Sequence, residues 1–420
     1  MRRRRWRVRG MNGPAPAGQE AGPAVGIGWR PEIDLTVERL PGVEFVEVIA
    51  EQLRPDRLPD SIVALRARGI PVVPHGVSLS LGGAGRPEAA RLRRLAECAE
   101  ALGAPLVSEH IAFVRSHGRD AGHLLPVPRT RPSLDVLVEN VRIAQDALGV
   151  PLALEHVAAV LAWPEDELTE AEFLSELLDR TGALLLLDVA NLYSSAVNFG
   201  TDPVAVLDAL PLDRIGYVHV AGGMLRGGVW HDTHTHPVGE PVLTLLAELA
   251  ARATPPAVLL ERDGHYPAAS VLRAELAAIR SAVGRAEAGT GAAPRLRLPD
   301  TRPVPCAPAV SPGGRADLDA AQHRLADALV GRTEPPPRFD RERVAVARSA
   351  LTAKRATAVA RHAPAVAEAL GARLPDLFAQ YAQARAKPAG DAAADVAAFV
   401  DHLRATGRLR GSRRRPRLRG

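Results

Sequence analysis

The sequence has very little cysteine: Cys98 and Cys306 are the only two in 420 residues. Two cysteines exclude a disulfide framework and are too few for a cage of thiolate ligands around a metal ion. Cys98 lies in the helical pattern RLRRLAECAEALG, where we expect it to be buried. A metal site in this chain would therefore be built from histidine and carboxylate side chains.

Long apolar runs are also absent. No stretch of 18 or more apolar residues occurs, so the sequence predicts no transmembrane helix. The N-terminal stretch is basic but lacks the apolar centre of a signal peptide. We therefore expect a cytoplasmic protein that does not act on membranes.

Acidic residues are missing from both ends of the chain. Residues 2–9 carry six arginines and residues 408–420 carry seven, with no Asp or Glu in either segment. The net charge of +5 therefore belongs to these arginines, without which the chain has a net charge of −8. Such segments are typical of solvated, disordered tails. We expect disordered tails over residues 1–23 and 408–420, and we do not expect nucleic acid as a partner.

Short apolar runs alternate with amphipathic segments through the first two thirds of the chain. This alternation predicts βα units and a parallel sheet, and about eight such units are typical of a TIM barrel. An open doubly wound sheet is the alternative, but no G-x-G-x-x-G follows the first run. The expected strands are 25–29, 45–49, 70–75, 105–110, 151–156, 183–188, 215–220 and 256–261. The expected helices between them include 87–102, 133–148, 170–181, 203–210 and 241–251.

The composition changes after residue 288. Residues 289–316 are rich in Pro, Gly and Ala, which is typical of a linker. Residues 317–407 show apolar stripes at helical spacing, which predict a small all-α domain whose stripes form its core. The catalytic barrel domain is accordingly expected over residues 24–288.

Most of the expected strands end in, or just before, a residue that can bind a metal ion. In a parallel barrel the carboxyl ends of all strands meet on one face, where the active sites of such barrels lie. Buried charge is costly unless it is paired or bound to metal, so seven such residues predict one shared polar site. They are Glu47, His75, His110, Glu155, Asp188, His219 and Glu261.

The stretch HVAGGMLRGGVWHDTHTHPV, from His219 to Val238, adds two further candidate ligands. Histidine and carboxylate together suit zinc, manganese or iron. One metal ion needs three or four protein ligands, so eight candidates suggest two or three ions with Glu155 as a bridge. The candidate metal ligands are His75, His110, Glu155, Asp188, His219, Asp232, His234 and Glu261.

Other polar residues near these ligands have different expected roles. His156 follows Glu155 and is expected to point to the opposite side of the strand. Asp263 and Asn198 are expected to orient ligands or substrate rather than bind metal. His231 and His236 are expected to be exposed loop residues.

We predict Glu155, Asp188 and Asn191 as the catalytic residues, with Asn191 orienting a ligand or the substrate. Glu47 lies in the middle of its strand and is a less direct candidate for the site. Gly82 and Gly83 are expected to form a loop that allows close approach of the backbone.

Eight motifs, read in order over residues 25–270, resemble the multinuclear non-heme iron-dependent oxidative enzymes, a TIM-barrel family formerly known as a domain of unknown function. The motifs are GIGWRPE, VEVIAE, HGVSLSLGG, SEHIAF, LLLDVANLY, VHVAGG, DTHTHPV and LLERD. The resemblance implies two or three iron ions (Fe²⁺/Fe³⁺) at the strand ends, with O2 as co-substrate. It also implies oxidation of cysteine in ribosomally made precursor peptides, in the maturation of natural products and copper-binding peptides. Carried over residue by residue, the family's ligands fall on the eight candidates named above.

The sequence departs from the family motifs at four places. His156 replaces an asparagine, and DVAN, DTHT and NFG each differ from the usual motif by one residue. Thr235 thereby stands where the family has a carboxylate. The main ligands are unchanged, so the departures concern the third metal and the particular reaction.

Members of this family often act with a separate partner that presents the precursor peptide. The helical region resembles the helical domain of such partners, with RSALTAKRATAVARHAPAVAEALG the best match. It is therefore expected to recruit the peptide or a partner protein; a plain helical docking module is the alternative.

Two other functions remain open from the sequence. One is a divalent-metal-dependent hydrolase or isomerase on a barrel of the sugar-isomerase or endonuclease type, which also collects His, Glu and Asp at its strand ends. Metal identity and O2 consumption distinguish it from the oxidase. The other is a non-enzymatic binding protein with basic tails, which predicts nucleic-acid affinity with a steep dependence on salt.

Overall fold

The computed structural model describes residues 22–116, 119–284, 296, 298–300, 310–388 and 392–409. Residues 1–21 and 410–420 of the two expected disordered tails lie outside the described residues, as does most of the expected linker. Among the described residues, every helix is too short or too polar to cross a bilayer.

Eight parallel strands form a closed barrel in the order β1-β12-β9-β8-β7-β4-β3-β2. The pairing of β1 with β12, which sets Ala24 beside Ala257, closes the ring. The predicted TIM barrel is therefore confirmed, and each expected strand matches one strand of the ring. The strands are β1 (Ala24–Trp29), β2 (Val46–Ile49), β3 (Val72–Gly76), β4 (Val107–His110), β7 (Leu152–Glu155), β8 (Leu184–Asp188), β9 (Ile215–Val220) and β12 (Ala257–Leu260).

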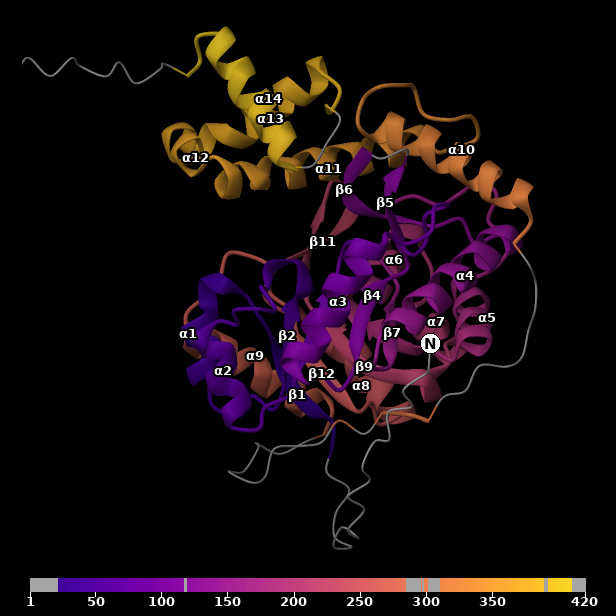
Figure 1. Cartoon of the computed structure of the whole chain (residues 1–420), viewed down its shortest axis with the longest axis vertical. Helices are drawn as coiled ribbons and strands as arrows, with labels where there is room; N and C mark the ends of the chain where they lie inside the picture. Colours follow the sequence, from indigo (N-terminus) through magenta and orange to yellow (C-terminus); the bar gives the residue numbers. More distant parts are fainter. Residues whose placement is uncertain are drawn as a thin grey trace, which may run out of the picture.

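Helices surround the barrel and follow most of its strands (Figure 1). Local signals fix their ends: Thr169 and Glu172 form a capping box at the start of α5, and Gly182, at φ 66°, ends it. The α-helices are α1 (Asp34–Arg39), α2 (Asp60–Ala67), α3 (Ala89–Leu102), α4 (Arg131–Ala147), α5 (Glu170–Thr181), α6 (Val189–Phe199), α7 (Pro203–Ala209), α8 (Glu240–Arg252) and α9 (Ala269–Ala282). Short 3-10 helices are η1 (Pro31–Ile33), η2 (Ala50–Gln52) and η3 (Leu212–Arg214).

Two antiparallel hairpins extend from the carboxyl end of the barrel. One joins β5 (Ala112–Ser116) to β6 (Arg119–Pro126) after β4, and the other joins β10 (Gly222–Arg226) to β11 (Val229–His236) after β9. Neither hairpin is predicted by the pattern of apolar runs in the sequence. Both lie on the side of the barrel that faces the C-terminal helices (Figure 1).

The interior of the barrel has an apolar layer below a polar layer. The apolar cluster includes Phe45, Val73, Ala153 and Tyr217, all fully or almost fully buried. Side chains alternate between the two faces of a strand, so the residue two positions later points into the same interior. The residues two positions later are Glu47, His75, Glu155 and His219. The barrel is thus filled below the polar site.

The C-terminal region is helical, as predicted, and divides into two parts by its packing. Helix α10 and the first half of α11 pack into the same apolar core as the barrel, through residues such as Leu325 and Leu351. The second half of α11 and the following helices enclose a separate core around Phe378 and Phe399. The helices are α10 (Pro312–Leu329), α11 (Arg341–His362), α12 (Pro364–Leu370), α13 (Leu374–Ala384) and α14 (Ala392–Ala405), with η4 (Gly371–Arg373) between α12 and α13.

Helix α10 is fixed to the glycine loop that follows β3. The buried Gln322 side chain donates to Gly82 O at 2.7 Å and accepts from Ala84 N at 3.0 Å. A Cβ atom at Gly82 would lie 2.0 Å from a Val127 methyl carbon, so this loop does need glycine for its close packing. Since α10 begins at Pro312, residues 312–316 of the segment predicted as linker belong to this helix instead.

Candidate metal centre

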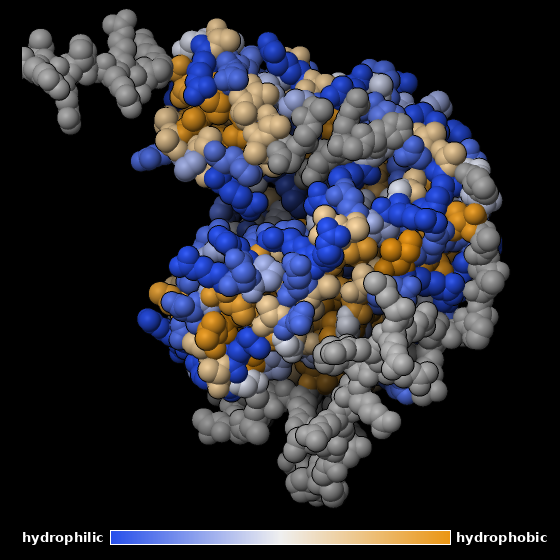
Figure 2. Space-filling view, viewed as in Figure 1, coloured by the Kyte–Doolittle hydropathy of each residue, from blue (hydrophilic) through white to orange (hydrophobic). Residues whose placement is uncertain are grey.

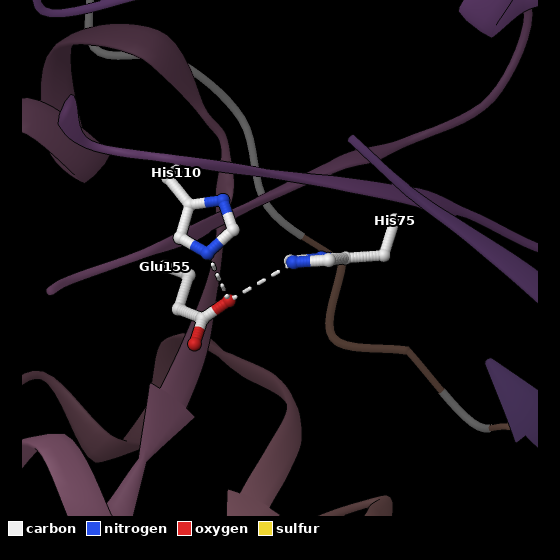
Figure 3. A group of neighbouring side chains, drawn as sticks. All are labelled: His75, His110 and Glu155. Atoms are coloured by element: carbon white, nitrogen blue, oxygen red, sulfur yellow. Dashed lines mark ion pairs between the residues drawn. The ribbon is translucent and has the colours of Figure 1, made fainter. Parts of the chain in front are cut away.

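The first group of possible metal ligands comes from three neighbouring strands. His75 lies at the penultimate position of β3, His110 ends β4 and Glu155 ends β7, and all three side chains are buried. Figure 3 shows both imidazole rings pointing at one carboxylate oxygen. His75 Nε2 lies 3.5 Å and His110 Nε2 lies 3.3 Å from Glu155 Oε2. Together they form a group that could hold a metal ion.

The second group shares Glu155 with the first. His219 Nδ1 lies 3.5 Å from Glu155 Oε1 and 3.2 Å from Glu261 Oε2, and Asp188 completes the group. Each of these four residues is buried. Because the two oxygens of Glu155 face different histidines, this carboxylate can bridge two metal positions.

Asp188 has two roles at the end of β8. Its Oδ1 accepts from Ala190 N at 2.7 Å and from Asn191 N at 2.9 Å, so the side chain caps helix α6. Its buried Oδ2 has no hydrogen-bond partner among the described residues. The cap therefore fixes the carboxyl group while one oxygen stays available to a metal ion.

The third group lies at the rim and contains His234, Glu261 and Asp263. His234 Nδ1 lies 3.3 Å from Glu261 Oε2 and 3.4 Å from Asp263 Oδ2. His234 has a φ of 53°, in the left-handed region that non-glycine residues rarely adopt. Asp232 lies on the other side of the ring, 2.5 Å from His234 Nε2. Arg30 binds both acidic residues of the group, Glu261 at 3.0 Å and Asp263 at 2.8 Å.

The hydrogen bonds of three histidines fix which ring nitrogen keeps its proton, so that the nitrogen facing the site is the one that a metal ion would bind. His110 Nδ1 lies 3.1 Å from the Gly76 carbonyl oxygen, which can only accept, so Nδ1 carries the proton. His219 Nε2 lies 2.7 Å from Glu47 Oε2, which fixes its proton in the same way. The other nitrogens, His110 Nε2 and His219 Nδ1, face the carboxylates.

His75 is fixed by a longer chain of hydrogen bonds. The Tyr217 hydroxyl lies 2.6 Å from both Glu47 Oε2 and Ser108 Oγ, and Ser108 Oγ lies 2.8 Å from His75 Nδ1. Tyr217 donates its single proton to the carboxylate, so Ser108 donates to Tyr217 and accepts from His75 Nδ1. His75 Nε2 is then the atom available to a metal ion, and Glu47 orients two histidines at once.

Sequence reasoning missed Tyr217 and Ser108 and undervalued Glu47. Glu47 and Tyr217 are both fully buried at the level where the apolar layer meets the polar layer. The available signal was the alternation of β2, because Glu47 shares the interior face with Phe45. Arg30, directly after β1, was missed as well. The position of a charged residue at the end of an apolar strand was the signal that could have indicated it.

The spacing of the donor atoms fits metal ions between them. Ligand atoms about 2.1 Å from one ion lie roughly 3.0–3.4 Å from each other in tetrahedral or octahedral geometry. The separations between histidine nitrogens and carboxylate oxygens that converge on Glu155 and Glu261 are 3.2–3.5 Å. Glu155 Oε2 and His219 Nδ1, like Asp188 Oδ2, have no hydrogen-bond partner among the described residues. Such buried atoms are costly without an ion to satisfy them.

The charges in the site shift several pKa values strongly. Burial alone would lower the pKa of His110, but Glu155 and Glu109 raise it to about 9. Burial would raise the pKa of Glu155, but His110 and His219 lower it to about 2. Burial, followed by the charges of Glu155 and Asp232, raises the pKa of Asp188 to about 7. Protons therefore compete with metal ions for the same atoms.

The other predicted residues fall around this centre. Asn191 Nδ2 donates to His156 O at 3.0 Å and to Glu155 Oε1 at 3.4 Å, so Asn191 does contact a candidate ligand. His156 turns away from the site and pairs with Glu170 at 3.0 Å. Asn198 donates to Ala159 O and Trp230 O, outside the three groups.

His231 and His236 were expected to be exposed loop residues, but both lie on strand β11 and belong to none of the three groups. Both are partly buried rather than exposed. His236 Nδ1 lies 2.7 Å from Thr233 Oγ1, within the hairpin itself.

Two family models match the chain. The family described as RiPP precursor modification enzyme MbnB/TglH/ChrH matches residues 24–284, and the family described as SCO6045-like, C-terminal domain, matches residues 319–405. A UPF0276 protein of Streptomyces avermitilis is 48% identical and covers 94% of this chain and 90% of its own length. A UPF0276 protein of Chromobacterium violaceum is 38% identical and covers 62% of this chain and 95% of its own length.

Solved structures show more distant likenesses. Endonuclease IV from Thermus thermophilus has a TM-score of 0.42 at 23% identity, covering 62% of this chain and 99% of that one. D-Psicose 3-epimerase from Clostridium cellulolyticum has a TM-score of 0.43 at 13% identity, with the same coverage. Neither likeness bears on the activity of this chain.

Proposed function

The chain belongs to the family of RiPP precursor modification enzymes MbnB/TglH/ChrH, and from this premise we propose that it is an O2-dependent oxidase with two or three iron ions. Its substrate would be a cysteine residue in a ribosomally made precursor peptide. We place the enzyme in the cytoplasm, where such peptides are made. The C-terminal helical region would help to recruit the peptide.

The observation that carries this proposal is the sharing of carboxylates between neighbouring groups of ligands. Glu155 belongs to the first and second groups, and Glu261 belongs to the second and third. A site for one isolated ion needs no shared carboxylate. Mixed histidine and carboxylate ligation is also typical of non-heme iron, which supports iron over a purely structural metal.

Different side chains would have different roles around such a centre. His75, His110, His219 and the shared carboxylates would hold the ions, and iron, when bound, would supply the redox chemistry with O2. Asn191 would hold Glu155 in its bridging orientation through Nδ2. The Asn191 Oδ1 atom is buried without a hydrogen-bond partner among the described residues, so we assign it to accept from an N–H group of the substrate.

Glu155→Gln tests the bridge directly. Because one carboxylate serves two groups, this variant is expected to lose most of the iron from both positions and nearly all O2 consumption with a cysteine-containing peptide. His75→Ala removes a ligand of the first group alone and is expected to lose about one iron per chain. Iron content and O2 uptake are the measurements.

The matched control is His236→Ala. This variant removes a histidine of strand β11 that lies outside the three groups. It is expected to keep both iron and activity. Wild-type iron content and O2 uptake in Glu155→Gln would contradict the proposed function. Zinc or manganese in place of iron would favour the hydrolase or isomerase instead.

A further inference from the structure

Helix α11 lies over the carboxyl end of the barrel, where the strand ends carry the candidate metal ligands (Figure 1). Figure 2 shows a cleft between the C-terminal helices and the barrel, and its visible walls are largely hydrophilic. The N-terminal half of α11 is fixed to the barrel: Arg343 Nη2 donates to Asn198 O at 2.6 Å. The C-terminal half therefore forms one wall of the cleft.

Two basic residues lie on the face of α11 that is turned toward the barrel. Lys354 follows Arg343 by eleven residues and Arg361 follows Lys354 by seven, which are near-whole numbers of helical turns. The three side chains consequently share one face of the helix. Lys354 and Arg361 are both exposed.

Lys354 reaches the hairpin beside the metal centre. Its Nζ lies 3.3 Å from His123 Nδ1 on β6. Burial, the Lys354 charge and the His110 charge lower the pKa of His123 to about 3, so its ring is neutral and accepts from the ammonium group.

Arg361 lies at the other end of the same face. Burial and the Glu32 charge raise the pKa of Tyr266, which follows β12 at the rim of the barrel, to about 12, and the Arg361 charge acts against this rise. Within the described part of the chain, neither Arg361 nor Lys354 forms an ion pair with a carboxylate. By contrast, Arg355 on another face of α11 is paired with the buried Asp395 at 2.7 Å. The charge of Arg355 is therefore neutralised within the helical region. Lys354 and Arg361 remain available to bind another molecule.

We propose, on the basis of the proposed function, that Lys354 and Arg361 bind an acidic segment of the precursor peptide and hold it along the cleft beside the metal centre. Seven helical residues span about 10 Å, which an extended peptide covers in about three residues. The segment should thus carry two acidic residues about three positions apart. The residue that binds Lys354 lies nearer to the cysteine to be oxidised.

Charge favours this occupant over the other segments available. Both tails of the chain are rich in arginine and would be repelled by the two cations. The rest of the chain has a net charge of −8, so an acidic peptide is disfavoured over most of its surface. Two unpaired cations at the cleft then determine where and in which direction such a peptide binds.

The test is fluorescence anisotropy with labelled twelve-residue Gly/Ser peptides and the full-length protein. One peptide carries two aspartates three positions apart, and its partner carries asparagines there. The Asp peptide is expected to bind more tightly, and less so at high salt. Lys354→Ala and Arg361→Ala are each expected to weaken its binding about fivefold. Arg341→Ala, on the opposite face of α11, is the matched control and should bind as the wild type does.

A charge swap gives a second test that does not depend on loss of binding. The double variant Lys354→Glu/Arg361→Glu is expected to prefer a peptide with lysines at the two positions. Equal binding of the Asp peptide to wild type and both alanine variants would overturn the proposal. Tighter, Lys354-dependent binding of a single-stranded oligonucleotide of the same length would overturn it in favour of a nucleic-acid surface.

Iron content, measured on the same preparations, separates this proposal from the proposed function. Peptide binding does not require metal, so a chain without iron that still binds the Asp peptide through Lys354 would refute the oxidase alone. A chain with iron and unchanged peptide binding in the variants would refute the docking surface alone.

Discussion

Histidine orientation depends on a small set of buried neighbours at the candidate metal centre. Glu47 receives hydrogen bonds from His219 and Tyr217, and Tyr217 continues through Ser108 to His75. Outer hydrogen bonds of this kind fix which ring nitrogen can bind metal. The candidate ligands at the barrel strand ends could be predicted because each ends or follows an apolar strand, whereas Asp232 and His234 lie in the polar strand β11. Ser108 and Tyr217 could not, because one hydroxyl inside a strand carries no pattern of its own.

Glu47→Gln tests this network. The amide can donate where the carboxylate only accepted, so His219 and Tyr217 are no longer held in one arrangement. We expect iron affinity to fall about 10- to 100-fold, measured by competition with a chelator. Tyr217→Phe interrupts only the path to His75 and is expected to have a smaller effect. Wild-type affinity in a folded Glu47→Gln protein would show that the network does not position the ligands.

Metal affinity should also depend on pH. The pKa of His110 is raised to about 9 and that of Asp188 to about 7, so both groups bind protons at lower pH that a metal ion must displace. Affinity is therefore expected to increase from pH 6 to pH 9. Calorimetry in two buffers of different ionisation enthalpy would measure the protons released. A metal affinity that is constant from pH 6 to pH 9 would contradict the raised pKa values of His110 and Asp188.

Secondary-structure elements beyond the barrel were harder to foresee. The β10–β11 hairpin turns at Gly227 and Gly228, both with positive φ, and a Gly-Gly pair is a known signal for a two-residue turn. That signal was present in the sequence, between two short runs too polar to suggest strands. The docking of α10 has no such local signal in the sequence, because Gln322 and Gly82, which form the hydrogen bond, are 240 residues apart.

Gln322→Ala tests the contribution of α10. The change leaves the buried Gly82 O and Ala84 N without their partner, which should lower the free energy of unfolding by about 1–3 kcal/mol. Chemical denaturation is the measurement. Arg324→Ala, an exposed position on the same helix, is the control and should change stability by less than about 0.5 kcal/mol. Equal effects of the two changes would mean that this contact does not stabilise the docking.

At the scale of the whole molecule, the barrel and the helical region could both be predicted from the periods of their apolar residues. Their relation could not, because it rests on contacts between segments far apart in sequence. Those contacts place α11 beside the mouth of the barrel, with Lys354 against His123. The molecule therefore combines a buried, metal-competent centre with a charged wall that faces the approach to it.

The central claim is that this barrel holds a multinuclear iron centre. The most direct test is elemental analysis combined with Mössbauer spectroscopy, on protein purified anaerobically from iron-supplemented cells. Two or three irons per chain with a coupled, mixed-valence spectrum are the predicted result. Zinc or manganese with little iron, or a single uncoupled iron per chain, would contradict the claim.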